Sequence, residues 1–222
     1  MLTKQALDTE FEFLTVDDTV GKAKELMGEL QVHCIPVVEP DTNRLVGQVM
    51  MNTLYESEED SLPLSELQLD EAVRIYKHQH IFEAARLMLQ YEQRLLPVVD
   101  EELVVHGIIE KQQVLESLTS MLNLASHGSV LSLELNRRDF TLSEIVQLIE
   151  TEGAKILGIT VETSNSEKGA IRVSIKLNLK DVTRVVAALR RFGYEVSTET
   201  KNEVYGIDFE TRVDELVKYL DM

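Results

Sequence analysis

The most constraining feature of this sequence is an internal repeat with an offset of 61 residues. The tripeptide Pro-Val-Val occurs at residues 36–38 and again at residues 97–99. The same offset pairs identical or similar residues upstream of this tripeptide: Val20 with Ile81, Ala23 with Ala84, and Met27 with Met88. A unit of this size cannot bury both of its faces alone, so the two copies are expected to pack against each other.

Each copy predicts the same order of elements: helix, strand, turn, strand and helix. Apolar runs predict strands over 35–38 and 45–49, and over 96–99 and 104–109. Asp17 or Asp18 is the expected N-cap of the first helix, and the closing helices are expected to begin near Thr53 and Gln113. The apolar faces of the opening helices are formed by Val20, Ala23, Met27 and Leu30 in one copy and by Ile81, Ala84, Ala85 and Met88 in the other.

The two copies together resemble the cystathionine-β-synthase (CBS) domain pair. The resemblance is carried by residues 35–38 with 45–47 and by residues 96–99 with 107–109, and it covers about residues 1–122. It implies a tandem CBS-domain pair of α/β class, with copies at about 1–60 and 61–122, built around a central cleft. It also implies that the cleft binds an adenine nucleotide or S-adenosylmethionine as a regulatory ligand.

The resemblance places the expected ligand-binding residues at the strand entries and just after the second strand of each copy. They are Cys34, Pro36, Gly47, Met50, Thr53, Arg94, Pro97, Gly107, Glu110 and Gln113. The prolines are expected to shape the cleft, the glycines to allow close backbone approach, and Arg94 to meet negative charge. The alternative for Arg94, and for His33 in the first copy, is an exposed residue at a strand entry.

Both copies depart from the pattern of the nucleotide-binding members. Those members follow the second-strand glycine with a hydroxyl residue near the phosphate and then an Asp that holds the ribose hydroxyls. At these two positions the first copy has Met50 and Thr53, and the second copy has Glu110 and Gln113. Both ribose carboxylates are therefore missing, and Glu110 would repel a phosphate.

Residues 129–199 predict a second, α+β domain with βαββαβ order, after a linker at 122–129. A capping box is expected at residues 141–144 and a helix cap at Asp181, with Phe192 facing inward. This ferredoxin-like order resembles the ACT domain, an amino-acid-sensing regulatory fold. A CBS pair followed by an ACT-like domain resembles the acetoin-utilisation-type CBS–ACT proteins of bacteria. Residues 200–222 predict an amphipathic C-terminal helix.

The turn after the first strand of this domain lacks the Pro and Gly found in amino-acid-binding ACT domains. Arg137 and Arg138 occupy it instead. They are expected either to grip a ligand carboxylate or to form a solvated loop.

The charge of the chain argues against two classes of partner. The formal net charge is −17, and residues 1–124 hold 9 Lys and Arg against 23 Asp and Glu. Nucleic acids and anionic membranes both require clustered cations, so neither is expected as a partner. The single cysteine, Cys34, cannot form an internal disulfide, which agrees with a cytoplasmic protein without a signal peptide.

No arrangement typical of an enzyme emerges from the sequence. His33 and Cys34 are neighbours on a strand and should point to opposite faces, and His78 with His80 has no third metal ligand nearby. The sequence does not identify a cofactor, and the candidate is an adenine nucleotide or S-adenosylmethionine as regulatory ligand. The predicted function is a homodimeric, non-enzymatic sensor that acts on an unidentified regulated protein. The alternative is a dimeric interaction scaffold with vestigial ligand sites.

Overall fold

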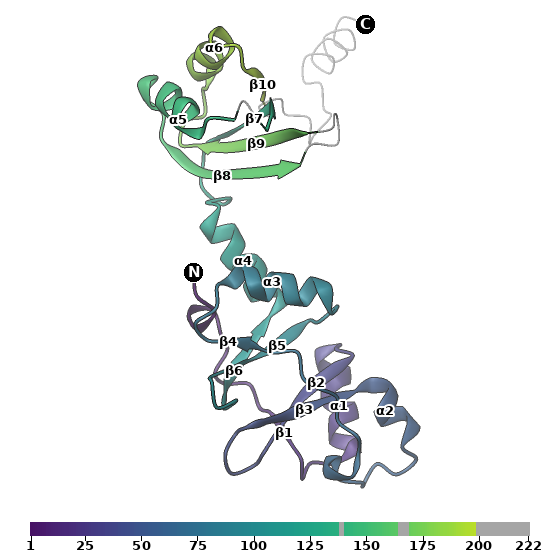
Figure 1. Cartoon of the computed structure of the whole chain (residues 1–222). Coiled ribbons are helices and arrows are strands. Elements are labelled where there is room, and N and C mark those ends of the chain that lie inside the picture. Colours follow the sequence, from purple (N-terminus) through teal and green to yellow (C-terminus); the bar gives the residue numbers. More distant parts are fainter. Residues whose placement is uncertain (138–139, 164–168, 199–222) are drawn as a thin grey trace, which may run out of the picture. The chain divides into compact units, whose positions relative to one another are not determined.

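The computed structural model describes residues 1–137, 140–163 and 169–198 (Figure 1). The chain divides into two compact units, Met1–Met121 and Leu122–Met222, which we call unit 1 and unit 2. Two predictions concern residues outside these ranges: the binding of a ligand carboxylate by Arg138 and the helix at 200–222.

Unit 1 contains the two copies of the repeat as two three-stranded sheets with their helices. The first copy consists of the 3-10 helix η1 (Thr3–Gln5), β1 (Leu14–Thr15), α1 (Val20–Leu30), β2 (Cys34–Val38), β3 (Leu45–Met50) and α2 (Met51–Glu56). The second consists of the 3-10 helix η2 (Leu64–Glu66), β4 (Ile75–Tyr76), α3 (Ile81–Gln90), β5 (Leu95–Val99), β6 (Val105–Glu110) and α4 (Lys111–Met121). The predicted order is confirmed. The prediction omitted β1 and β4, because two-residue strands are too short to show an alternation of apolar and polar residues.

Both sheets have the same pairing. The middle strand, β2 or β5, pairs in parallel with the short first strand and antiparallel with the third strand. Its five residues are all buried. In the first copy, Ile35 and Val37 share a core with residues of α1, and Val38 lies in a cluster with Val99 of the other copy. The continuous apolar runs of the sequence therefore mark strands that are buried on both faces.

The helix starts differ from the predicted ones. The N-cap of α1 is Thr19, whose hydroxyl accepts a hydrogen bond from the backbone N–H of Lys22 at 3.3 Å, so the predicted Asp17 or Asp18 cap is wrong. Asp18 instead accepts from the backbone N–H of Thr15 at 2.8 Å. The closing helices begin two residues before the predicted starts, which puts Thr53 and Gln113 in their first turns.

The two copies are joined by backbone pairing that crosses between them. The segment before β1 of the first copy pairs Asp8 with Ile108 of β6, and the segment before β4 of the second copy pairs Asp70 with Gln48 of β3. In each case both backbone hydrogen bonds form, at 2.7 to 2.9 Å. Leu95 and Ile108 of the second copy also lie in the core of the first. The copies therefore fold as one body.

Gly47 and Gly107, which correspond to each other after one extra residue in the first copy, stand at these crossings. A Cβ atom at Gly47 would lie 2.7 Å from the carbonyl oxygen of Asp70, and one at Gly107 would lie 2.2 Å from that of Asp8. The close approach that the glycines allow is therefore made by the chain's own backbone, which corrects the expectation that they make room for a ligand.

Asp100 organises the turn between β5 and β6. Its carboxylate accepts hydrogen bonds from the backbone N–H groups of Glu102 and Val104, at 3.2 and 2.9 Å, and from His106 Nε2 at 2.7 Å. The bond from His106 is the largest cause that lowers the pKa of Asp100 below its ordinary value of 3.8. The ionised carboxylate therefore stabilises this hairpin.

Unit 2 has the predicted βαββαβ order. Its elements are β7 (Ser129–Asn136), α5 (Leu142–Thr151), β8 (Ile156–Thr163), β9 (Ala170–Leu177), α6 (Thr183–Arg191) and β10 (Glu195–Thr198). The antiparallel sheet has the order β10-β7-β9-β8, so the first and third strands lie in the centre.

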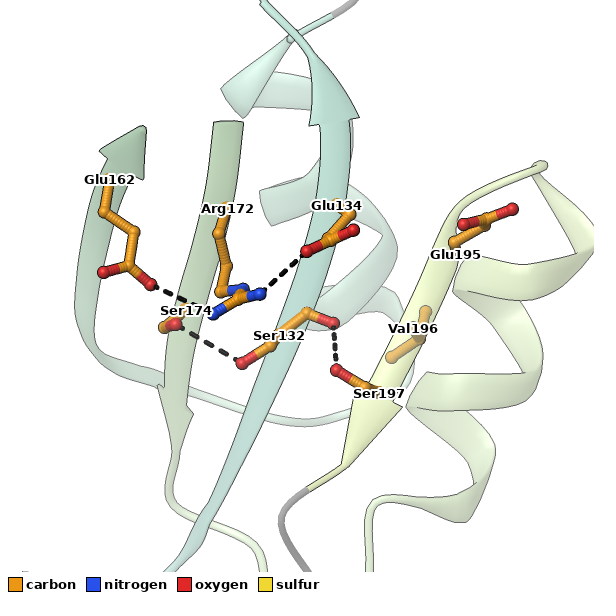
Figure 2. A pocket seen from close by; sticks show the side chains of 8 residues that line it. All are labelled: Ser132, Glu134, Glu162, Arg172, Ser174, Glu195, Val196 and Ser197. Atoms are coloured by element: carbon orange, nitrogen blue, oxygen red, sulfur yellow. Dashed lines mark hydrogen bonds and ion pairs between the residues drawn. The ribbon is translucent and has the colours of Figure 1, made fainter. Parts of the chain in front are cut away.

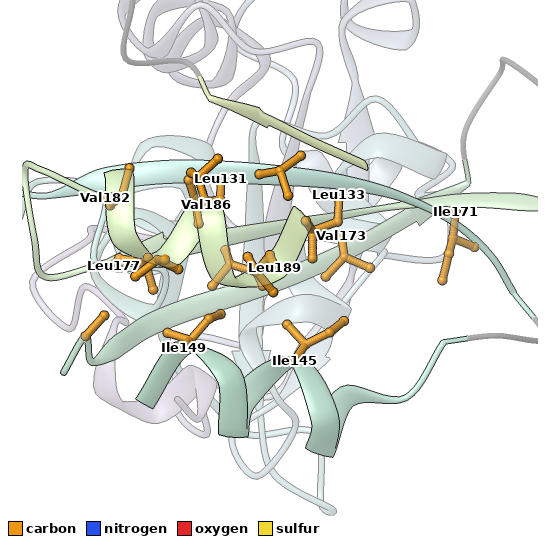
Figure 3. Close-up of a cluster of buried hydrophobic side chains, with 14 residues drawn as sticks. Leu131, Leu133, Ile145, Ile149, Ile171, Val173, Leu177, Val182, Val186 and Leu189 are labelled. Atoms are coloured by element: carbon orange, nitrogen blue, oxygen red, sulfur yellow. The ribbon is translucent and has the colours of Figure 1, made fainter. Parts of the chain in front are cut away.

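The two faces of this sheet differ in polarity because side chains alternate along each strand. The open face carries polar residues such as Ser132, Glu134, Arg172 and Ser174 (Figure 2). The covered face packs against α5 and α6 (Figure 3). Its core includes Leu131, Leu133, Ile145, Ile149, Val173, Ile175, Leu177, Val185 and Leu189.

Three local predictions in unit 2 are wrong. Thr141 is the N-cap of α5 but makes no side-chain capping bond, and Glu144 accepts from the hydroxyl of Tyr194 at 2.9 Å instead of completing a capping box. The N-cap of α6 is Val182, and Asp181 accepts from the backbone N–H of Thr183 at 3.0 Å. Phe192 follows the helix and is 55% exposed, so it does not face the core.

The backbone crossings predict a strong effect of a methyl group at Gly107. Gly107→Ala is expected to lower the free energy of unfolding by about 2–4 kcal/mol, because the Cβ would clash with a backbone oxygen that cannot move freely. The matched control is Gly28→Ala on the exposed side of α1, where nothing lies within 4 Å. Gly28→Ala should raise the free energy of unfolding by about 0.5–1 kcal/mol. Urea denaturation measures both, and equal effects would contradict this account of the glycine.

The Asp100 turn predicts a pH-dependent contribution to stability. Because the folded-state pKa of Asp100 lies below its unfolded value, the contribution is present above about pH 4 and is lost as the pH falls through the folded-state pKa. Asp100→Asn should therefore lower the urea midpoint at pH 7, and the difference from wild type should narrow near pH 3. Glu102→Gln, on an exposed side chain in the same turn, is the control. A difference that is constant with pH would exclude the charge as its cause.

Candidate functional site

A groove of about 940 Å³ lies in unit 1, and both copies line it. The first copy contributes the end of α1 and Val32, and the second contributes the start of β5 and the first turns of α4. Leu30, Val32, Leu95 and Leu115 form its apolar part. Leu115 is 64% exposed, which is unusual for a leucine on a helix and leaves apolar surface available to a ligand.

Arg94 connects the two copies beside this groove. Its Nη1 donates a hydrogen bond to the carbonyl oxygen of Gln31 at 3.0 Å. Gln31 is the left-handed C-cap residue of α1, so this bond adds to the capping of that helix. The guanidinium remains exposed. It can therefore exchange this carbonyl partner for an anionic group in the groove.

The charges around the groove are mixed. Arg94 and Lys111 are cationic, whereas Glu29, Glu110 and Glu116 are anionic. Lys111 is the first residue of α4, where the helix dipole also favours an anion. Three carboxylates against two cations disfavour a ligand that carries several phosphates.

Gln113 is not among the residues that line the groove. Its Oε1 accepts a hydrogen bond from the backbone N–H of Glu110 at 2.8 Å, which satisfies a donor at the start of α4. The residue that replaces a ribose-binding Asp therefore caps the helix. The corresponding residue of the first copy, Thr53, is half-buried in α2, after Met50 at the N-cap.

The other predicted site residues lie apart from the groove lining. Pro36 and Pro97 are buried inside β2 and β5. Cys34 is also buried, and its thiol donates to Oε1 of Gln93 at 2.7 Å. Burial raises the pKa of this thiol, which keeps it protonated. Of the ten predicted residues, the groove lining thus includes Arg94 and Glu110.

Sequence reasoning misses most of the groove lining, which comes from α1, the segment between α1 and β2, the start of β5, and α4. The missed residues are Glu29, Leu30, Val32, Leu95, Lys111, Gln112, Leu115 and Glu116. Leu115 is the one that could have been found. It is an apolar residue on α4 that lies outside the buried face formed by Val114 and Ser117. The others become neighbours only when the end of α1 meets the start of β5.

The two histidines considered as metal ligands have separate roles. His80 is the N-cap of α3, and its Nδ1 accepts from the backbone N–H of Phe82 at 3.3 Å. The ring of His78 stacks on Tyr76 with 5.8 Å between ring centroids, and its Nδ1 lies 3.4 Å from Glu101 Oε1. Within residues 1–137, 140–163 and 169–198, no three or more His, Cys, Asp or Glu side chains are arranged to hold a metal ion.

A second cavity of about 540 Å³ lies on the open face of the sheet in unit 2 (Figure 2). Arg172 is its centre, with Nη2 at 2.8 Å from Glu134 Oε1 and Nη1 at 3.8 Å from Glu162 Oε1. Glu134 is the main cause that raises the pKa of Arg172. The cavity is thus built around an ion pair that already engages its one guanidinium. Arg137, the predicted carboxylate ligand, is exposed and is not among its lining residues.

None of the helices in the described part of the chain combines the length and the apolar character that crossing a membrane requires.

Comparisons with known proteins agree with the repeat. The family model of the CBS domain matches residues 4–58 and 64–120. The CBS domain-containing protein YhcV of Bacillus subtilis (strain 168) is 28% identical over 136 residues, which cover 57% of this chain and 96% of that protein.

Two solved structures are also similar. A CBS domain pair/ACT domain protein from Thermotoga maritima has a TM-score of 0.48 and 24% identity, over 55% of this chain and 99% of that one. A Vibrio cholerae protein, named provisionally as an acetoin utilization protein (AcuB), has a TM-score of 0.46 and 24% identity, over 56% and 95%. Since the family model matches both copies and about half of the residues, this chain belongs to the CBS domain family.

Proposed function

We propose that this chain is a cytoplasmic, non-enzymatic regulatory protein whose CBS pair binds a small adenine compound in the groove beside Arg94. CBS domain pairs commonly bind adenine nucleotides or S-adenosylmethionine as regulators. Proteins with these domains are typically regulatory rather than catalytic. The observation that carries the proposal is the exposed guanidinium of Arg94 beside an apolar groove that both copies line.

The chemistry of the groove favours ligands of low negative charge. An adenine ring can lie against Leu30, Val32 and Leu115, while Arg94 and Lys111 hold one anionic group. Three nearby carboxylates oppose a triphosphate. AMP, with one phosphate, and S-adenosylmethionine, with a carboxylate and two cationic centres, fit this balance better than ATP.

Binding would be linked to the contact between the two copies. An anion that takes Arg94 removes a hydrogen bond from the carbonyl oxygen of Gln31 and thereby loosens the end of α1. A ligand shifts a conformational equilibrium by its difference in affinity for the two states. The ligand would bind more tightly to the state in which Arg94 has released Gln31, so the hydrogen bond between these residues gives the two states different affinities.

Unit 2 completes the proposal as an ACT-like domain over residues 129–199. Its βαββαβ order and its single layer of helices support that assignment, although many unrelated domains share this topology. We propose further that the protein is a homodimer of the acetoin-utilisation type and that it regulates a partner protein. Neither nucleic acid nor a membrane is proposed as a partner.

The function is tested first by a thermal-shift screen against AMP, ATP, S-adenosylmethionine and the amino acids. A ligand at about one hundred times its dissociation constant adds about 2.7 kcal/mol, or roughly 5–10 °C for a chain of this size. We expect AMP or S-adenosylmethionine to raise the melting temperature more than ATP does. No shift with any adenine compound would contradict the proposal and favour the interaction scaffold.

A substitution at Arg94 tests the site. Arg94→Ala is expected to lower the affinity for the stabilising adenine compound by more than about tenfold, because a charge-assisted hydrogen bond to the anionic group is lost. Isothermal titration calorimetry measures the affinity. Arg44→Ala, at an exposed arginine between β2 and β3, is the control and should leave the affinity unchanged. Equal affinities of wild type and Arg94→Ala would remove Arg94 from the site.

A further inference from the structure

A smaller cavity of about 340 Å³ in unit 1 is separate from the groove. It lies between the segment that leads into β4 and the second half of α3, and it shares no lining residue with the groove. Arg74, just before β4, and Tyr76, in β4, line one side, and Leu87 and Tyr91 line the other from the helix and its C-cap. It thus combines one guanidinium with two phenol rings and an apolar side chain.

The internal repeat shows that the fold does not require this chemistry. At the offset of 61 residues, the first copy has Phe13, Thr15, Leu26 and Leu30 in place of Arg74, Tyr76, Leu87 and Tyr91. Phe13 is partly buried and packs against two apolar clusters of unit 1. The same strand position is therefore compatible with an apolar side chain. The cation and the phenols are specific to the second copy.

The guanidinium of Arg74 is incompletely satisfied. Its Nη1 donates hydrogen bonds to Glu71 Oε1 at 3.1 Å and to the carbonyl oxygen of Ala72 at 3.3 Å, and the side chain of Tyr76 lies close enough to raise the pKa of Arg74. Its Nε is buried and has no hydrogen-bond partner, the only such side-chain atom within residues 1–137, 140–163 and 169–198. A buried donor without a partner is costly, so its retention calls for an explanation.

We propose that this cavity binds a small organic anion, a carboxylate carried on a flat apolar or aromatic group. Arginine holds carboxylates best through two parallel N–H donors, and the edge of Arg74 that includes Nε carries an unpartnered donor, which would face the cavity once the guanidinium turns. Tyr76, Tyr91 and Leu87 provide contact surface for the flat group. The volume of about 340 Å³ is large enough for a ligand of the size of benzoate.

Glu71 acts as a competitor in this site. Its side chain is 85% exposed and forms a half-solvated ion pair with Arg74, and such pairs are weak. When Glu71 moves into solvent, the guanidinium can turn and present the Nε edge to the cavity. A ligand carboxylate then replaces the carboxylate of Glu71, and the charge of the site is conserved.

The experiment titrates the full chain with sodium benzoate and, as an uncharged analogue, with benzamide, by isothermal titration calorimetry. Arg74→Gln is expected to weaken benzoate binding by about tenfold or more. Glu71→Gln removes the competitor and should strengthen binding about two- to threefold. Arg86→Gln is the matched control, because Arg86 lies on the exposed side of α3 and pairs with Glu83 outside this cavity.

Opposite changes for Arg74→Gln and Glu71→Gln, with no change for Arg86→Gln and weaker binding of benzamide than benzoate, would support the site. The Glu71 variant keeps the test informative if Arg74→Gln fails to fold, since a purely structural ion pair predicts no gain in affinity. Failure of benzoate to bind the wild type, or equal binding by all the variants, would overturn the proposal.

Discussion

Unit 1 depends on the exchange of backbone pairing between its two copies. The segment before the first strand of each copy forms a bridge to the third strand of the other, through Asp8 with Ile108 and Asp70 with Gln48. Gly47 and Gly107 stand where this crossing leaves no room for a side chain. A three-stranded sheet with two helices has too little core to be stable alone. The crossing strands and the shared core around Leu95 and Ile108 join two such halves into one folded body.

The candidate groove is a consequence of this arrangement. The end of α1 belongs to one copy and the start of β5 to the other, and they meet because the two copies share a core. Arg94 joins them with a bond to the exposed carbonyl of a helix end. A ligand in the groove responds mainly to the charges within about a Debye length, which are two cations and three carboxylates, and less to the net charge of the whole chain.

The two copies are similar where they are buried and different where they carry chemistry. Val20 and Ile81, or Met27 and Met88, fill equivalent places in the core. In contrast, Arg94 corresponds to His33, Gln113 to Thr53, and Arg74 to Phe13. Burial constrains the first group through packing, which is sensitive to every methyl group. The second group is free to diverge, so the functions of the protein are to be sought among these pairs.

The sequence by itself determined the repeat, the order of the elements in each copy and the βαββαβ order of unit 2, because each depends on the spacing of apolar residues within a short segment. Arg94, which the sequence analysis placed at the cleft, is among the residues that line the groove, and its role in binding stays a prediction. Tertiary structure alone decided the rest. Gly107 faces Asp8, Gln113 caps its own helix, and Leu30 joins Arg94 in one groove. These contacts join residues that are distant in sequence or depend on where a helix begins, and neither is encoded in local periodicity.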